Sequence, residues 1–183
     1  DFRVEAQYAA RFRQQFLDDE QIRIPGVIWE LSTRRVLCLD YLPGIKINDR
    51  KAIVEAGIDP SAVAEIGAAS YLKQLVRFGF FHADPHPGNL AVASDGALIY
   101  YDFGMMGVLS DGLRRRIGSM VRAAAARDSA ALVAELQGAG LIGAEIDVGP
   151  VRRLVRVMLQ DALTPPFSSN VIDKLSGDLY DLV

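Results

Sequence analysis

The segment 82–89, His-Ala-Asp-Pro-His-Pro-Gly-Asn, is the feature that most constrains how this chain can fold. Its two prolines exclude regular helix, because proline lacks a backbone N–H and its ring clashes with the preceding helical turn. Apolar residues at helical spacing over 62–76 precede it, and Gly79 marks the expected helix end. Residues 90–101 follow as two apolar runs around a short turn signal. We therefore expect an irregular loop between a helix and a strand–turn–strand.

Three side chains that carry oxygen ligands come from this region: Asp84, Asn89 and Asp102. Phosphoryl transfer needs a carboxylate beside the attacking hydroxyl, and Mg²⁺ held by hard oxygen ligands. The five-position spacing of Asp84 and Asn89 matches the Asp-x-x-x-x-Asn of kinase catalytic loops. The hairpin can return Asp102 to the same metal, and Gly104 lets the backbone turn away. The alternative, two loops that contain acids by chance, is disfavoured because the motifs occur together and in order.

Two histidines flank Asp84. His82 precedes it as a histidine does in kinase catalytic loops, and we expect this side chain to support the loop and the Asp-Phe-Gly segment. His86, taken with His82 and Asp84, could suggest zinc. Three ligands on a proline-rich loop without cysteine make a poor zinc site, so we expect His86 to order the loop through a hydrogen bond.

The remaining patterns predict an α+β fold that is mostly helical. An apolar pair of runs at 24–31 and 36–41 predicts a hairpin. Helices are expected over 1–16, 49–57, 59–78, 111–126, 128–139 and 149–163, and Thr164-Pro165-Pro166 should break the last of these. The run 171–183 also has an amphipathic helical pattern.

Composition excludes several classes of protein. The 183 residues suffice for one domain with a buried core, and the net charge of −3 argues against a nucleic-acid binder. Cys38 is the only cysteine, which excludes an internal disulfide and a cysteine cluster for zinc. No apolar stretch approaches the roughly 20 residues of a membrane span. Helical patterns at both ends lead us to expect a fragment of a longer protein.

The loop segment 81–89 together with 101–107, Tyr-Asp-Phe-Gly-Met-Met-Gly, resembles the AarF/UbiB family of atypical kinases. Residues 5–12 resemble the family's Glu-Ala…Arg-Phe helix, and 25–31 its Pro-x-Val-x-Trp-Glu strand. Residues 40–44, Asp-Tyr-Leu-Pro-Gly, resemble its hinge. The Tyr-Tyr-Asp-Phe-Gly form and the stretch 150–153 are similar to cyanobacterial and plastid members in particular.

The resemblance implies a protein-kinase-like C-terminal lobe with short hairpins over 49–183. Residues 1–48 would be a remnant of the N-terminal lobe, with a helix, two strands and the hinge. It also implies an enzyme that binds ATP and Mg²⁺ and acts in prenyl-lipid or isoprenoid-quinone metabolism at a membrane surface, with no nucleic-acid partner. The implied location is a plastid or the bacterial cytoplasm and inner-membrane face, peripheral to the membrane.

Residue roles carry over from the matching motifs. The resemblance makes Asp84 the catalytic aspartate and Asn89 and Asp102 the metal ligands. Glu5 would belong to the helix that supports a nucleotide-binding lysine. The hinge under the adenine would be Asp40, Tyr41 and Leu42, although the family often has glutamate at position 40. The family's Lys-x-Gly-Gln motif, nucleotide loop and strand lysine would lie before Asp1, so this chain alone should bind ATP poorly.

Two rival functions stay open beside the ATP-dependent enzyme. One is a pseudokinase-like scaffold that binds a lipid or protein, and the other is an aminoglycoside- or choline-kinase-like phosphotransferase with a similar His-x-Asp-x-x-x-x-Asn loop. Retention of Asp84, Asn89 and Asp102 favours an enzyme, and Met-Met-Gly at 105–107 favours AarF/UbiB. The run Arg114-Arg115-Arg116 is either the solvated side of a helix or, less favoured, a patch for anionic lipid.

Overall fold

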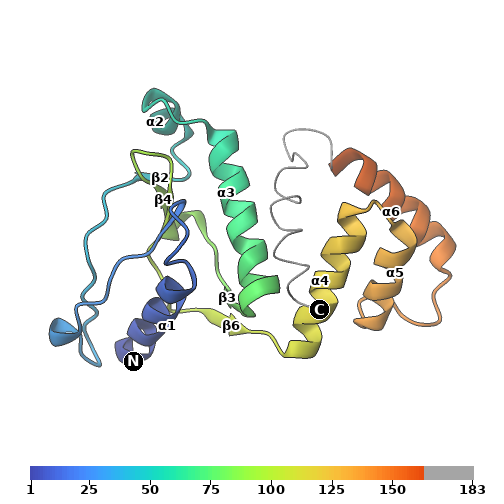
Figure 1. Ribbon diagram of the computed structural model, residues 1–183, viewed down its shortest axis with the longest axis horizontal. Helices are drawn as coiled ribbons and strands as arrows, with labels where there is room; N and C mark the ends of the chain where they lie inside the picture. Colours follow the sequence, from blue (N-terminus) through green and yellow to red (C-terminus); the bar gives the residue numbers. More distant parts are fainter. Residues whose placement is uncertain (163–183) are drawn as a thin grey trace. The chain divides into compact units, whose positions relative to one another are not determined.

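The computed structural model describes residues 1–162 of the protein, and these fall into two compact units (Figure 1). The first unit contains residues 1–74 and 80–108. The second contains residues 75–79 and, within the described part of the chain, 109–162. The loop and hairpin singled out by the sequence belong to the first unit.

Helix α1 (Phe2–Gln15) supplies part of the core of the first unit. Asp1 caps it, because the Asp1 carboxylate accepts the backbone N–H of Arg3 at 3.1 Å. Its small and aromatic residues recur at helical spacing on one face, which is fully buried: Ala6, Ala9, Phe12. The Phe12 ring lies 5.2 Å from that of Tyr100 and 5.7 Å from that of Phe103, so α1 packs directly on the residues around Asp102.

A four-stranded sheet forms the other part of this core, in the order β1-β5-β4-β2. The expected strand–turn–strand is confirmed as β4 (Leu90–Val92) and β5 (Leu98–Tyr100), which pair antiparallel. Two strands that the sequence analysis missed flank them: β1 (Ile22–Arg23) runs parallel to β5, and β2 (Ile45–Lys46) antiparallel to β4. Each has only two residues, too short to show a period of two.

A second, two-stranded sheet joins β3 (Phe80–His82) to β6 (Met106–Val108). The proline-containing segment forms no regular helix, as expected, but the sequence analysis missed the short strand β3 at its start. The partners are separated by more than 20 residues, and such non-local pairing leaves no periodic signal in a three-residue strand. The irregular loop itself begins after His82 and ends in η3, a 3₁₀ turn (Pro87–Asn89).

Helices α2 (Arg50–Glu55) and α3 (Pro60–Leu72) precede this sheet. The expected long helix over 59–78 divides in two, because the α-helix ends at Leu72 and continues as a π-helical turn, η2 (Lys73–Phe78). Gly79 then ends it with a φ of 63°, a left-handed conformation that glycine adopts without steric cost. Helix α3 contacts β5, and the hydroxyl of Ser70 near its C-terminal end lies 2.8 Å from that of Tyr100.

The expected hairpin over 24–31 and 36–41 is corrected by the structure. Val27 and Leu39 form a single antiparallel bridge, and residues 29–31 form a 3₁₀ helix, η1 (Trp29–Leu31). The Ser32 hydroxyl donates to the carbonyl of Ile28 at 2.9 Å and accepts the N–H of Cys38 at 3.1 Å. The Ser32 side chain thus occupies a backbone carbonyl and a backbone N–H that would otherwise pair between two strands, and this interrupts the sheet.

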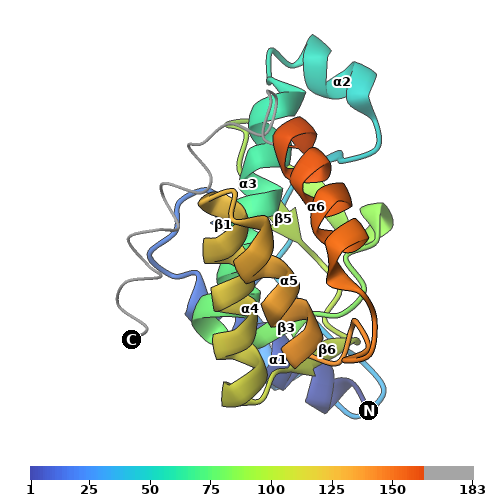
Figure 2. The ribbon, with the colours of Figure 1, turned by 90° about the vertical axis from the view of Figure 1, so that its right-hand side faces the viewer.

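The second unit contains three helices: α4 (Asp111–Ala125), α5 (Ser129–Gly138) and α6 (Val148–Ala162). Their predicted ranges are confirmed to within one residue at each described end. Helix α5 contacts both α4 and α6, as Figure 2 also shows. The predicted break at 164–166 and the helical pattern at 171–183 lie outside the described residues.

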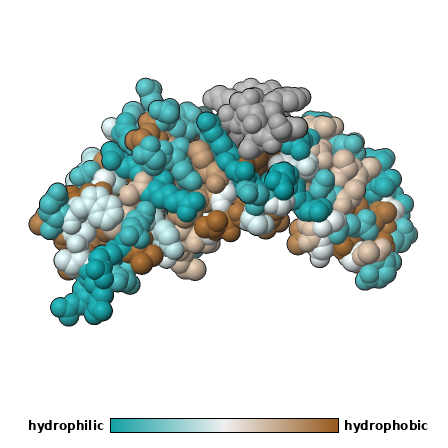
Figure 3. Space-filling model, turned by 60° about the horizontal axis from the view of Figure 1, so that its bottom comes forward, coloured by the Kyte–Doolittle hydropathy of each residue, from teal (hydrophilic) through white to brown (hydrophobic). Residues whose placement is uncertain are grey.

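The fold class, α+β and mostly helical, is confirmed. The expected division into 1–48 and 49–183 concerns the lobes of a longer protein and stays a prediction, since the compact units divide the chain elsewhere. None of the helices within residues 1–162 is both long and apolar enough to cross a membrane. On the face in Figure 3, hydrophobic and hydrophilic residues are interspersed over both units.

Candidate active site

His82 joins the two loops that carry the predicted acids. Its side chain is 1% exposed, so both ring nitrogens need partners within the protein. Nδ1 accepts the backbone N–H of Asp84 at 3.2 Å, and Nε2 lies 2.6 Å from the carbonyl oxygen of Asp102. Both contacts are hydrogen bonds only when the proton is on Nε2, which then donates to Asp102. One buried imidazole therefore fixes the backbones of both aspartates.

Backbone pairing brings Asn89 to the same place. The N–H of Tyr101 donates to the carbonyl of Asn89 at 3.0 Å, so Asn89 lies across from the residue that precedes Asp102. The N–H of Ala83 donates to the carbonyl of Met105 at 2.8 Å and extends the β3–β6 pairing toward Asp84. The structure thus brings together the three loop positions that the sequence analysis grouped.

The oxygen atoms of these residues are largely without protein partners. Within residues 1–162, no hydrogen bond or ion pair engages the side chains of Asp84 or Asn89. Asp102 accepts the backbone N–H of Gly104 through Oδ1 at 2.8 Å, which orients the carboxylate and leaves Oδ2 unpaired among the described residues. Asp84 and Asp102 are both exposed, so these oxygens are accessible to a ligand.

Glu5 of α1 adds a further carboxylate beside this group. It accepts a hydrogen bond from the backbone N–H of Phe103, which ties α1 to the Asp-Phe-Gly segment. Partial burial, and next the negative charge of Asp102, raise the pKa of Glu5 above its ordinary value. The site therefore holds an excess of negative charge.

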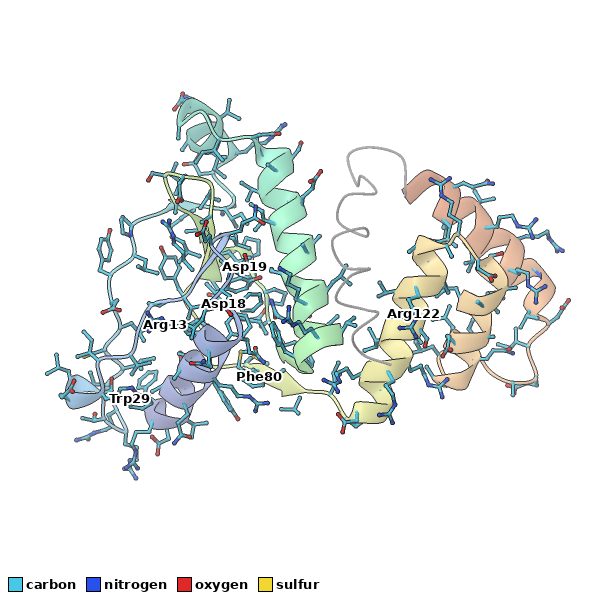
Figure 4. All side chains as sticks on the ribbon, in the orientation of Figure 1. Arg13, Asp18, Asp19, Trp29, Phe80 and Arg122 are labelled. Atoms are coloured by element: carbon cyan, nitrogen blue, oxygen red, sulfur yellow. The ribbon has the colours of Figure 1, made fainter. Side chains whose placement is uncertain are left out.

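Phe103 points into the core and anchors the Asp102 loop. It is fully buried, and its ring lies 5.7 Å from Phe12 and 6.4 Å from His82. Phe80, labelled in Figure 4, supports the other loop. Its ring centre lies 5.8 Å from that of Tyr8 in a tilted arrangement, and the Arg11 guanidinium lies 4.0 Å above it. Both loops thus rest on α1 through an aromatic side chain.

The predicted hinge residues lie on the edge of the first unit. Asp40 accepts the backbone N–H of Gly26 at 3.1 Å, and Tyr41 is 87% exposed. The carbonyl of Leu42 accepts the hydroxyl of Tyr101 at 2.7 Å. This bond ties the hinge to the residue before Asp102, a connection that the sequence analysis missed because the two residues are 59 positions apart.

His86 contacts its own loop. Nδ1 accepts the backbone N–H of Gly88 at 3.0 Å and caps η3, which holds the turn before Asn89. His86 is exposed, and no group of three or more His, Cys, Asp or Glu side chains within residues 1–162 is arranged to hold a metal ion. Both histidines therefore bond to backbone groups of these loops, which leaves the oxygen side chains as the candidate ligand groups.

These oxygens suit Mg²⁺ better than a softer metal. Asn89 and Asp102 offer one amide and one carboxylate oxygen, and Mg²⁺ usually takes one or two carboxylates with waters and phosphate oxygens completing its six ligands. Among the described residues, neither Oδ2 of Asp102 nor the Asn89 side chain has a hydrogen-bond partner, so both could serve as ligands. These residues fit an Mg²⁺ ion that is bound together with a phosphate. They supply too few ligands to hold the ion by protein side chains alone.

The sequence analysis also missed a buried polar group behind the loops: Ser70, Gln74, Tyr100. A signal was available, because Ser70 and Gln74 interrupt an otherwise apolar helical face. Polar residues at such positions indicate a hydrogen-bond network in the core.

The family model for the ABC1 atypical kinase-like domain matches residues 1–136. The chain belongs to this family. The predicted resemblance to AarF/UbiB atypical kinases, and to cyanobacterial and plastid members, is confirmed.

Among the relatives of this ABC1 domain, the Synechocystis protein sll1770 is 39% identical over 183 residues, which is 100% of this chain and 31% of that protein. The chloroplastic protein Activity of BC1 Complex Kinase 7 of Arabidopsis thaliana is 36% identical over 181 residues, 98% of this chain and 26% of that protein. The ABC1 chain thus spans a third or less of the length of these relatives.

A solved structure of the Rv3197–erythromycin complex from Mycobacterium tuberculosis has the same fold. The TM-score is 0.60 at 22% identity, and the match covers 87% of this ABC1 chain and 41% of that chain. At this identity the likeness extends to the fold alone.

Proposed function

We propose that the full-length protein is an ATP-dependent enzyme that uses Mg²⁺ for phosphoryl transfer or ATP hydrolysis. The observation that carries the proposal is the His82 ring, which hydrogen-bonds to the backbones of both Asp84 and Asp102. A scaffold protein does not require two exposed acids to be fixed to one buried imidazole. The family membership supports a kinase-like activity.

Each residue has a distinct role in the proposed reaction. Asp84 orients the attacking hydroxyl or water and accepts its proton, because its carboxylate has no protein partner within residues 1–162. Asn89 and Asp102 would hold Mg²⁺, whose chemistry when bound is to neutralise charge on the phosphates. The bond from Gly104 N–H keeps Oδ1 of Asp102 in place, so that Oδ2 can turn to the ion.

We further propose that the hinge residues Asp40, Tyr41 and Leu42 lie under the adenine, and that Glu5 supports a nucleotide-binding lysine. The proximity of Glu5 to Asp102 supports this role: burial and, second, repulsion from Asp102 raise the pKa of Glu5, and an ammonium group there would offset the repulsion. The lysine itself is expected before Asp1.

The process we propose is prenyl-lipid or isoprenoid-quinone metabolism at a membrane surface, in a plastid or on the cytoplasmic face of a bacterial membrane. The chloroplastic and cyanobacterial relatives support this setting. The lipid-binding residues would lie in other parts of the full-length protein, with or without a contribution from this chain.

The test is phosphate release from ATP by the full-length protein, with Mg²⁺ and with the ion removed by a chelator. Turnover that requires Mg²⁺ supports the proposal, and no turnover in any condition contradicts it in favour of a scaffold. Parallel assays with vesicles that contain a prenyl-quinone test the lipid. Equal rates with and without these vesicles would contradict the lipid role only.

A further inference from the structure

Three polar residues lie in the core behind the catalytic loop without belonging to the acid and metal positions. Ser70 is 2% exposed, Gln74 0% and Tyr100 2%. A polar group buried to this degree costs about 1–3 kcal/mol if it lacks a hydrogen-bond partner. Their partners therefore decide whether they stabilise the fold alone or serve the site.

The three side chains form a hydrogen-bonded relay that ends at His82. The Ser70 hydroxyl donates to the carbonyl of Gly67 at 2.9 Å, and it lies 2.8 Å from the Tyr100 hydroxyl. Gln74 Nε2 donates to that hydroxyl at 3.3 Å, and Gln74 Oε1 accepts the backbone N–H of His82 at 2.9 Å.

Only one direction of hydrogen bonding satisfies this relay. Ser70 gives its single hydroxyl hydrogen to Gly67, so Tyr100 must donate to Ser70 and its oxygen must accept from Gln74. Burial raises the pKa of Tyr100, which keeps its hydroxyl protonated and able to donate. The Gln74 amide therefore has one orientation, with Oε1 toward His82.

The relay acts on the residue that connects the two acids. The backbone N–H of His82 donates to Gln74, and the His82 ring bonds to the backbones of Asp84 and Asp102. Gln74 lies in the π-helical turn η2, which begins at Lys73 where α3 ends. A π turn changes the direction of the side chains that follow it, and such turns are frequent at functional sites.

We infer that Gln74 is a positioning residue of the catalytic loop, with Ser70 and Tyr100 fixing its amide so that it holds His82 and, through it, the backbones of Asp84 and Asp102. The catalytic part of this inference rests on the proposed function, whereas the positioning of His82 does not. Gln74 itself is buried behind His82 and contacts no substrate.

The test compares Gln74→Met, a substitution of similar size without hydrogen-bonding groups, with Gln14→Met on the exposed side of α1. In the ¹⁵N-histidine-labelled full-length protein, the signals of His82 and exposed His86 are assigned by their loss in His82→Gln and His86→Gln variants, and His86 serves as internal reference. The hydrogen bonds of the ring predict that the parent protein shows His82 protonated on Nε2. Gln74→Met should shift the His82 amide signal and reduce the Nε2-protonated fraction, and leave His86 unchanged.

Kinetics on the full-length protein form the second readout. Gln74→Met should lower kcat by about 10- to 100-fold with little change in the KM for ATP, because small misplacements of reacting groups have effects of this size. Tyr100→Phe and Ser70→Ala should change both readouts in the same direction and less. They also keep the test decisive if Gln74→Met does not fold.

Unaltered His82 signals in the variants would overturn the inference, as would a lower melting temperature with an unchanged kcat. Absence of ATP turnover by the parent protein would instead contradict the proposed function. In that case the His82 signals alone decide whether Gln74 positions the loop.

Discussion

Glu5 and Asp102 face the same side of Gly104. A Cβ atom at Gly104 would lie 3.7 Å from Oε2 of Glu5 and 3.2 Å from Oδ1 of Asp102. The two carboxylates come from α1 and from the Asp-Phe-Gly segment, and Glu5 also accepts the N–H of Phe103. A helix near the start of the chain is thereby connected to the proposed metal ligand by a hydrogen bond and by charge repulsion. This relationship makes the region attractive to a cation.

Replacement of Asp102 by Asn should abolish Mg²⁺-dependent ATP turnover in the full-length protein, with a loss of at least about 100-fold in kcat. The amide oxygen of the substituted side chain can still accept the Gly104 N–H, so the loop should keep its shape while the negative charge that binds the ion is lost. Phosphate release measures the effect. Asp18→Asn, a charge change on exposed Asp18 after α1 (Figure 4), is the matched control. Undiminished turnover in Asp102→Asn would exclude Asp102 as a metal ligand.

Asp84→Asn should slow hydrolysis by about 100-fold or more and leave nucleotide binding largely intact, because a general base contributes to the chemical step. Calorimetry measures the affinity for ATP, and phosphate release the rate. The backbone N–H at position 84 still donates to His82 in the variant, so the loop is retained. A weaker affinity with an unchanged rate would assign Asp84 to binding instead.

Glu5→Gln should raise the free energy of unfolding of the metal-free chain at neutral pH, by less than about 1 kcal/mol for a partly exposed group. The raised pKa of Glu5 means that the folded chain binds this proton more tightly than the unfolded chain does. Its stabilising contribution is present below the unfolded value of 4.5 and is lost as pH rises through the folded pKa.

The stability difference between Glu5→Gln and the parent should therefore close as the pH falls below about 4.5, the ordinary pKa of a glutamate such as Glu5. Thermal unfolding across this pH range measures the stability difference. Added Mg²⁺ at neutral pH should reduce the stability difference between the variant and the parent. A Glu5→Gln variant that is less stable than the parent at neutral pH would show that a cation already pairs with Glu5.

Arg11→Leu should lower the free energy of unfolding by about 0.5–1 kcal/mol, the typical strength of an exposed cation–π contact. The Arg11 guanidinium lies 4.0 Å from the centre of the Phe80 ring, and Leu keeps part of the apolar contact without the charge. Arg11→Lys should retain a part of the stability. Denaturant unfolding compares the three proteins, and equal midpoints would show that the contact contributes nothing.

Tyr101→Phe should weaken ATP binding and leave kcat nearly unchanged. The variant loses the 2.7 Å hydrogen bond from the Tyr101 hydroxyl to the Leu42 carbonyl, which ties the proposed hinge to the residue that follows β5. A bond of this kind contributes about 1 kcal/mol, equivalent to an increase of roughly fivefold in the Kd for ATP. Tyr8→Phe controls for loss of a hydroxyl elsewhere. A fall in kcat with unchanged Kd would contradict a role in the hinge.

Local rules determined much of this protein. The prolines of the loop, the turn at 94–96 and the glycine at 79 were enough to predict the loop, the β4–β5 hairpin and the end of the helix. The spacing of Asp84, Asn89 and Asp102 predicted which side chains to examine, and the motifs predicted the family that the ABC1 match confirms. The loop, the hairpin and the helix end can be predicted from the sequence because each depends on the conformational limits of a few neighbouring residues.

Tertiary structure decided the rest. Ser32 interrupts the expected hairpin at 24–41, and short strands β1, β2, β3 and β6 pair with partners far along the chain. The relay from Ser70 to His82 and the bond from Tyr101 to Leu42 also join residues that no local pattern connects. A hydrogen bond between distant segments depends on where packing brings their atoms to within about 3 Å. Sequence spacing alone does not encode that distance.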